Sequence, residues 1–163
     1  MGRVAELGSL ADYAPRMKLT AHLLFLCCVA LLLAGCGGTY EPTDAKGQAD
    51  CYRMEFGTLP PAGVTNIHGK QIIIGDAAGA WLRFEATPAL VDTLLKGFTS
   101  TNRQTFDEHS GGANTPAWWT PDSNHITAFF VISGWRKDFS HSSAVLAHDA
   151  DKRVVYFCHD AFD

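Results

Sequence analysis

The clearest hydrophobic pattern in this chain predicts a helix over residues 88–97. Apolar side chains recur every four residues and share one stripe, at Leu90, Leu94 and Phe98. Thr87 stands where an N-cap is expected, Pro88 suits the first helical position, and Gly97 is a residue type at which helices end. We therefore expect one main helix whose apolar stripe faces the core.

Five other segments have the alternation or the β-branched content that is typical of strands. They are residues 64–74, 80–86, 126–133, 142–149 and 154–159. The first two flank a turn at residues 76–79 and the last two flank residues 150–153, so each pair is expected to form a hairpin. Residues 52–56 fit a short helix or a strand equally well.

Together these elements predict a single α+β domain. We expect a two-layer sandwich, in which a mostly antiparallel sheet of about five strands carries the 88–97 helix on one face. Residues 99–122 are polar and contain Gly, Pro and Asn, so this stretch is expected to be a long loop.

An apolar run from Leu23 to Leu33 precedes this domain. The run is too short to cross a hydrocarbon layer of about 30 Å, but it has the length of a signal-peptide core. The longer uncharged stretch of residues 19–40 leaves a transmembrane anchor as a second interpretation, which its threonine, histidine and glycine residues disfavour.

The end of this run, Leu33-Ala34-Gly35-Cys36, resembles the lipobox of bacterial lipoproteins. The resemblance implies that diacylglyceryl is attached to the Cys36 thiol and that signal peptidase II cleaves between Gly35 and Cys36. It also favours Met17 as the start, with a short polar stretch before the apolar run. Acyl chains on one cysteine, palmitate among them, would hold the protein on a membrane almost permanently.

The lipobox divides the chain into four parts. Residues 1–16 are expected to be an overextended gene start, 17–35 the signal peptide, 36–47 a lipidated tether, and 48–163 the folded domain. Gly37, rather than Asp, follows the lipidated cysteine. In Gram-negative lipoproteins that pattern implies sorting to the outer membrane, facing the periplasm.

Charge and cysteine content narrow the partners and the compartment. The formal net charge of the 163 residues is −4 and no basic run is present, which argues against a nucleic-acid partner. Cys51 and Cys158 remain as a pair once the signal peptide is removed and Cys36 is lipidated. In an oxidising compartment we expect a structural disulfide between them, while a redox or metal-binding pair is the alternative.

Histidines are frequent, yet their spacing does not predict a metal site. If Asp149 pairs with Val154, His148 and His159 share a face of the last hairpin but lie about 13 Å apart. One ion needs ligands at about 2 Å, so these two cannot share it. We expect neither a metal nor any other cofactor.

The best candidate for ligand binding is the pair Trp118-Trp119 in the long loop. Adjacent tryptophans can stack on sugar rings or grip a protein, and His109, Asn114 and Asn124 could add polar contacts. The alternative, which we favour, is that one or both rings cap the open end of the sheet.

These features predict a non-catalytic, lipid-anchored envelope module that binds a protein or a wall glycan through residues 99–122. An anchored inhibitor or immunity-type protein, directed against a wall hydrolase or a toxin, is one alternative. An envelope-acting enzyme is another, and it would need a concave site that joins His109 with Asp107 or His141. Short fragments also resemble small bacterial envelope lipoproteins, but imply no activity: Leu59-Pro60-Pro61, Leu82-Arg83-Phe84, Trp118-Trp119 with Pro121, and Val155-Tyr156-Phe157.

Overall fold

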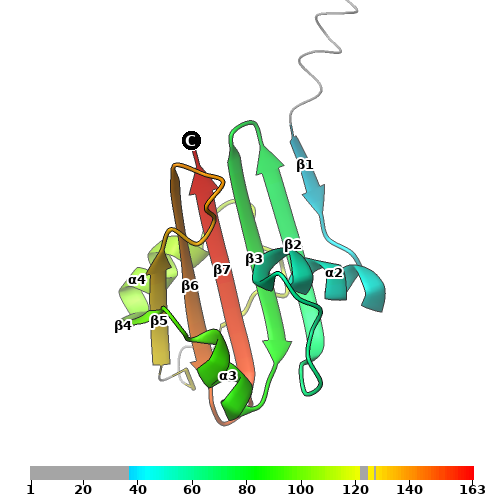
Figure 1. The fold of residues 1–163 in the computed structure, drawn as a ribbon, viewed down its shortest axis with the longest axis vertical. Coiled ribbons are helices and arrows are strands. Elements are labelled where there is room, and N and C mark those ends of the chain that lie inside the picture. The colour runs from blue at the N-terminus through cyan, green and yellow to red at the C-terminus, as the bar shows by residue number, and fades with distance from the viewer. Residues whose placement is uncertain (1–36, 122–124, 127) are drawn as a thin grey trace, which may run out of the picture. The chain divides into compact units, whose positions relative to one another are not determined.

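The computed structural model describes residues 37–121, 125–126 and 128–163 (Figure 1). The predicted gene start, signal peptide and lipobox, with Cys36, lie outside the described residues. Among the helices that are described, none has the length and apolar character needed to cross a membrane.

The described part of the chain forms one antiparallel sheet with helices on both faces. The strands lie in the order β1-β2-β3-β7-β6-β5-β4. The elements are β1 (Gly37–Tyr40), α2 (Ala45–Phe56), β2 (Thr65–Ile74), β3 (Ala77–Glu85), α3 (Pro88–Leu94), β4 (Thr99–Thr101), α4 (Arg103–Ser110), β5 (Ala128–Ser133), β6 (His141–Asp149) and β7 (Val154–Phe162). The predicted α+β class and the antiparallel sheet are therefore confirmed.

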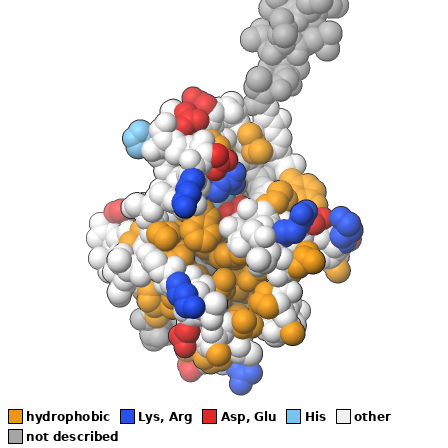
Figure 2. Space-filling model, in the orientation of Figure 1, with side chains coloured by type: hydrophobic (Ala, Val, Ile, Leu, Met, Phe, Trp, Pro, Cys, Tyr) orange, Lys and Arg blue, Asp and Glu red, His pale blue; other side chains and the backbone are white. Residues whose placement is uncertain are grey.

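Two hydrophobic clusters lie on opposite faces of the sheet, because successive strand residues point to opposite sides. On the α2 face, α2 and α3 pack on a cluster that includes Tyr52, Leu82, Phe84, Val91, Leu146, Val155 and Phe157. On the α4 face, α4 and the segment after it pack on a cluster that includes Trp81, Phe106, Trp119, Val145, Tyr156 and Cys158. Figure 2 shows hydrophobic side chains on the face that carries α2 and α3, with charged side chains around them.

The number of layers and of strands differs from the prediction. The sheet has seven strands instead of about five, three helices are described instead of one, and both faces are covered, so the domain has three layers. The two missed strands, β1 and β4, have four and three residues, mostly exposed, so they carry no alternating pattern.

Residues 52–56, for which a helix and a strand fitted equally well, belong to the helix α2. The Asp44 carboxylate caps its first turn by accepting a hydrogen bond from the Gly47 amide at 2.9 Å. Gly57 ends it in the left-handed region with φ 73°, and its amide donates to the Arg53 carbonyl at 2.8 Å. The buried residues follow helical spacing, but half of them are not hydrophobic: Gly47, Cys51, Tyr52 and Glu55.

Both predicted hairpins are present. β6 and β7 pair in the predicted register, with Asp149 opposite Val154, so His148 and His159 share the α2 face at a distance too great for one ion. β2 and β3 also pair, but their turn is Gly75-Asp76 rather than residues 76–79, because Ile74 pairs with Ala77. Gly75 has φ 60°, a conformation that glycine adopts without strain in tight hairpin turns.

Residues 37–47 are not the free tether that the sequence predicted. Gly37–Tyr40 form β1, which pairs along the end of β2, and α2 begins at Ala45. Gly37–Asp163 form one compact unit, so the domain begins at Gly37 and not at residue 48. The glycines that suggested flexibility fit an edge strand instead, where Gly37 lies close to the Ile73 backbone.

The predicted loop, which the structure describes as far as residue 121, contains more regular structure than expected. It contains β4 and α4, whose N-cap Asn102 accepts a hydrogen bond from the Thr105 amide at 3.0 Å. The main predicted helix is α3, which is shorter than expected and ends at Leu94. Its N-cap is Thr87 as predicted, and Pro88 is its first residue.

Candidate functional site

The structure separates the two tryptophans that the sequence singled out. Trp119 is 8% exposed and packs between Phe106 and Tyr156 on the α4 face. Trp118 is half-buried, donates its indole N–H to the Glu41 carboxylate at 2.8 Å, and lies beside the His68 ring. Trp119 therefore belongs to the hydrophobic cluster on the α4 face and is not available as an exposed ligand-binding ring.

The polar residues expected around this pair do not gather there. His109 donates from Nδ1 to the Thr105 carbonyl of its own helix at 2.8 Å. The carbonyl of the exposed Asn114 accepts a hydrogen bond from the Lys70 amine at 2.9 Å, while Asn124 lies outside the described residues. Asn114 thus connects the segment to β2 through Lys70, whereas the His109 side chain bonds within α4, so these two residues do not form a shared ligand site.

The residues proposed for the enzymatic alternative also have other contacts. The Asp107 carboxylate forms an ion pair with Arg103 of the same helix, at 2.8 Å. His141, at the start of β6, stacks on Phe162 with ring centroids 5.0 Å apart. Among the described residues, no group of three or more His, Cys, Asp or Glu side chains could hold a metal ion.

The predicted disulfide between Cys51 and Cys158 is absent, and both thiols are free and buried. Cys51 belongs to the cluster on the α2 face and Cys158 to the cluster on the α4 face, so the sheet separates them. Burial raises the pKa of the Cys51 thiol to about 11, and it also raises the pKa of the Cys158 thiol well above its usual value. The sequence leaves only these two cysteines to pair with each other, but the sheet determines the face on which each thiol lies.

A different group of residues forms a polar centre on the α2 face. Gln71, Ala80 and His159 lie side by side on one rung across β2, β3 and β7. His159 has alanines as neighbours on both sides, since it pairs with Ala80 and with Ala144. These small side chains leave room above the sheet for a carboxylate, which Glu55 of α2 supplies.

Glu55 and His159 form a buried acid–imidazole pair. Their side chains are 0% and 2% exposed, and His159 Nδ1 lies 2.6 Å from Glu55 Oε2. The approach does not have the alignment of a hydrogen bond, and within the described chain Nε2 on the other side of the ring has no hydrogen-bond partner. A buried polar atom without a partner is rare and needs an explanation, such as a ligand that completes it.

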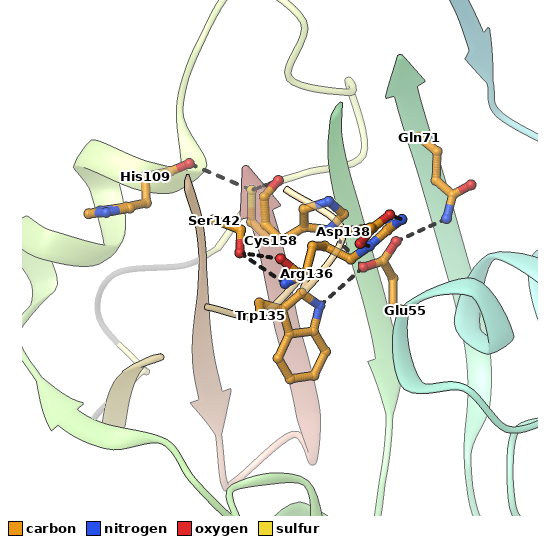
Figure 3. Close-up of polar contacts among 9 residues, drawn as sticks. Glu55, Gln71, His109, Trp135, Arg136, Asp138, Ser142 and Cys158 are labelled. Carbon is orange, nitrogen blue, oxygen red and sulfur yellow. Dashed lines mark hydrogen bonds and ion pairs between the residues drawn. The ribbon is translucent and has the colours of Figure 1, made fainter. Parts of the chain in front are cut away.

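Neighbouring side chains fix the carboxylate of Glu55 in place (Figure 3). The Gln71 amide donates to Oε1 at 3.0 Å, and the Trp135 indole N–H donates to Oε2 at 3.4 Å. The Trp135 ring in turn packs against Phe56 and Phe157, so the donor is held by the core. Both carboxylate oxygens therefore have donors that come from other elements than α2.

An arginine on the loop between β5 and β6 lies at the edge of this centre. Ser142 shapes the loop, because its hydroxyl accepts from the Arg136 amide at 3.0 Å and donates to the Arg136 carbonyl at 2.9 Å. The guanidinium forms two hydrogen bonds with the Asp138 carboxylate, at 2.9 and 2.7 Å. This pairing lowers the pKa of Asp138 and raises the pKa of Arg136.

Glu55 and His159 line a cleft of about 330 Å³. Its other polar residues are Gln71, Arg136 and Asp138, and its apolar residues are Met54, Ile72, Ile73, Ala78 and Phe139, with Gly79 between them. Arg136 forms an ion pair with Asp138, and the Glu55 carboxylate lies 2.6 Å from His159 Nδ1. The lining therefore combines hydrogen-bonding side chains with apolar ones, which suits a neutral polar group.

Sequence reasoning missed this centre because its parts come from four distant segments. The predicted register of the last hairpin already placed His159 opposite Ala144, which was one available signal. The position of Glu55 could not be derived, because residues 52–56 fitted two kinds of element. The chain has no match among protein-family models, curated proteins or solved structures. The candidate site is therefore inferred from its geometry alone.

Proposed function

We propose that this protein is a lipid-anchored lipoprotein of the bacterial cell envelope whose domain is a non-catalytic binding module. The lipobox at Cys36 supports the anchor, and Gly37 supports the outer membrane, facing the periplasm, as its location. The ligand site is the cleft around Glu55 and His159 rather than residues 99–122, because Trp119 is a core residue.

The observation that carries the binding site is the buried imidazole of His159, a lining residue of the cleft whose Nε2 has no hydrogen-bond partner among the described residues. A buried carboxylate beside an imidazole adds little to stability compared with apolar residues of the same volume, so the presence of Glu55 and His159 supports a role in recognition. Cell-wall glycan offers neutral hydroxyl and N-acetyl groups of suitable chemistry, and a volume of about 330 Å³ admits roughly one sugar ring.

The binding test measures cosedimentation of the full-length, detergent-solubilised protein with purified peptidoglycan. We expect H159Q to weaken binding by roughly ten- to a hundredfold, because one buried hydrogen bond of about 1–3 kcal/mol is lost. H141Q, which changes an exposed histidine outside the cleft, is the matched control and should bind like the wild type.

A second variant separates binding from folding. Ala78 lines the cleft and is partly exposed, so A78F introduces a large ring that reduces the space for a ligand. It should retain the wild-type circular dichroism and lose binding. Wild-type protein that does not sediment with peptidoglycan would contradict the proposed ligand, and released glycan fragments would point to an enzyme instead.

The anchor is tested separately by replacing the lipidated cysteine. C36A should leave the protein uncleaved by signal peptidase II and without acyl chains, as measured by mass spectrometry of protein from cells. An unmodified Cys36 thiol in the wild-type protein would contradict the proposed anchor.

A further inference from the structure

One end of the sheet exposes large hydrophobic side chains. Gly37 pairs with Ile74, Ile74 with Ala77, and Ala77 with Phe162, so these four residues form one rung across β1, β2, β3 and β7. Ile74 is 58% exposed and Phe162 is 47% exposed, although both belong to strands. Ile73, on the other face at the same end, is 59% exposed.

The exposed large hydrophobic side chains are concentrated at this end of the sheet. In the described part of the chain six large hydrophobic side chains are exposed, and three of them are at this end. The α4 face is covered further along the same strands, where Ile72 is only 7% exposed. The apolar rung therefore begins where the cover of the α4 face stops.

The rung lies directly beside the attachment point of the chain. Gly37 is peptide-bonded to Cys36, so the two Cα atoms are about 3.8 Å apart. From β1 to β7 the rung crosses three gaps of about 4.8 Å, or about 14 Å in total. No linker separates the cysteine from the sheet, because β1 begins at Gly37.

We propose that this end of the sheet, with Ile73, Ile74 and Phe162, rests in the interface of the lipid bilayer. The inference rests on the proposed lipidation of Cys36. Acyl chains on that residue bring Gly37 to the level of the headgroups. With the rung parallel to the membrane surface, Ile74 and Phe162 lie at the same level, at the depth of about 5–10 Å that interfacial apolar groups reach. Asp76 and Asp163, exposed at the same end, keep the contact shallow.

The proposed membrane contact also determines where the ligand site lies relative to the bilayer. Ile73 lines the cleft around His159 as well as belonging to the apolar end. The cleft therefore opens beside the membrane surface, and the module would meet its ligand close to the bilayer rather than at a distance from it.

The test uses the full-length lipidated protein, purified from cells and reconstituted into vesicles of phosphatidylcholine and phosphatidylethanolamine that contain nitroxide-labelled phospholipid. An environment-sensitive fluorophore is attached in separate variants, I74C and F162C. Cys51 and Cys158 are buried, so they compete little for the label. L59C is the matched control, because Leu59 is 64% exposed but lies in the loop before Thr65, at the other end of β2.

We expect the fluorophores at positions 74 and 162 to shift to the blue and to be quenched by the nitroxide lipid, while the one at position 59 stays unquenched. Equal quenching at all three positions, or none, in protein that still floats with the vesicles would overturn the inference and leave the anchor intact. A blue shift without quenching would show that protein, such as a second copy, covers the rung, and would overturn it too. Protein that does not float with the vesicles would overturn the proposed anchor itself.

Discussion

The two faces of the sheet are formed by the same strands, but different kinds of side chain are buried on each face. On the α4 face, aromatic rings close the surface, and two of them also form hydrogen bonds: Trp81 Nε1 donates to the Ser110 carbonyl at 3.0 Å, and the Tyr156 hydroxyl donates to the Thr120 carbonyl at 3.1 Å. On the α2 face, the centre holds a buried carboxylate and an imidazole with a free nitrogen. The α4 face is therefore built for stability, and the α2 face keeps an open polar cleft that stability alone does not require.

The largest expected change in the free energy of unfolding comes from substitutions in the hydrophobic cluster on the α4 face. W119A should lower the free energy of unfolding by about 3–5 kcal/mol, because it leaves a cavity between Phe106 and Tyr156. W118A should cost only about 1 kcal/mol, since that ring is half-buried and loses mainly its hydrogen bond to Glu41. Urea unfolding followed by circular dichroism measures both, and equal losses would mean that the two tryptophans are equivalent.

A second prediction concerns how closely α2 approaches the sheet. A methyl group at Gly69 would lie 2.4 Å from Cys51 Cβ and 3.0 Å from Leu82 Cδ2. G69A should therefore destabilise the domain by about 1–3 kcal/mol through overpacking. G38A is the matched control in the neighbouring strand, because nothing lies within 4 Å of its added methyl group, and its urea midpoint should not change. A wild-type midpoint for G69A would show that α2 can move away freely.

The smallest expected effect is a pH dependence of the stability, which comes from His148 on the α2 face. Burial lowers the pKa of His148 below 6.5, although Asp149 and Asp92 oppose the shift. Below about pH 6.5 the unfolded chain then binds a proton more readily than the folded chain, so stability falls as the pH decreases. Urea midpoints at pH 7.5 and pH 5.5 should differ less in H148Q than in the wild type, and an identical difference would contradict a buried neutral imidazole.

Local patterns predicted those elements whose residues interact with near neighbours. The stripe of α3, its N-cap and the register of the β6–β7 hairpin are set by residues a few positions apart. β1, β4 and α4 escaped prediction because they are short and mostly polar or exposed, and are held by their neighbours in the sheet. The helix α2 was undecided because its buried face includes Gly47 and Glu55, which do not look like core residues.

The candidate site could not be predicted from patterns within short stretches of the sequence. Adjacent positions Trp118 and Trp119 look alike in sequence, yet only one of them faces the core. Cys51 and Cys158 were paired by elimination, but the sheet lies between them. Glu55 and His159, which no motif connects, meet because α2 packs over β2 and β3, and β7 pairs with β3.

The amino-acid sequence by itself determined the helix at residues 88–97 in outline, two hairpins and the α+β class, because these depend on periodicity and turn residues within short stretches. The resemblance to a lipobox, too, depends on four consecutive residues. Only the tertiary structure decided that both faces of the sheet are covered, that the thiols are apart, and that Glu55 meets His159. Those outcomes depend on pairing between segments about a hundred residues apart, which the chain specifies through packing and not through any local signal.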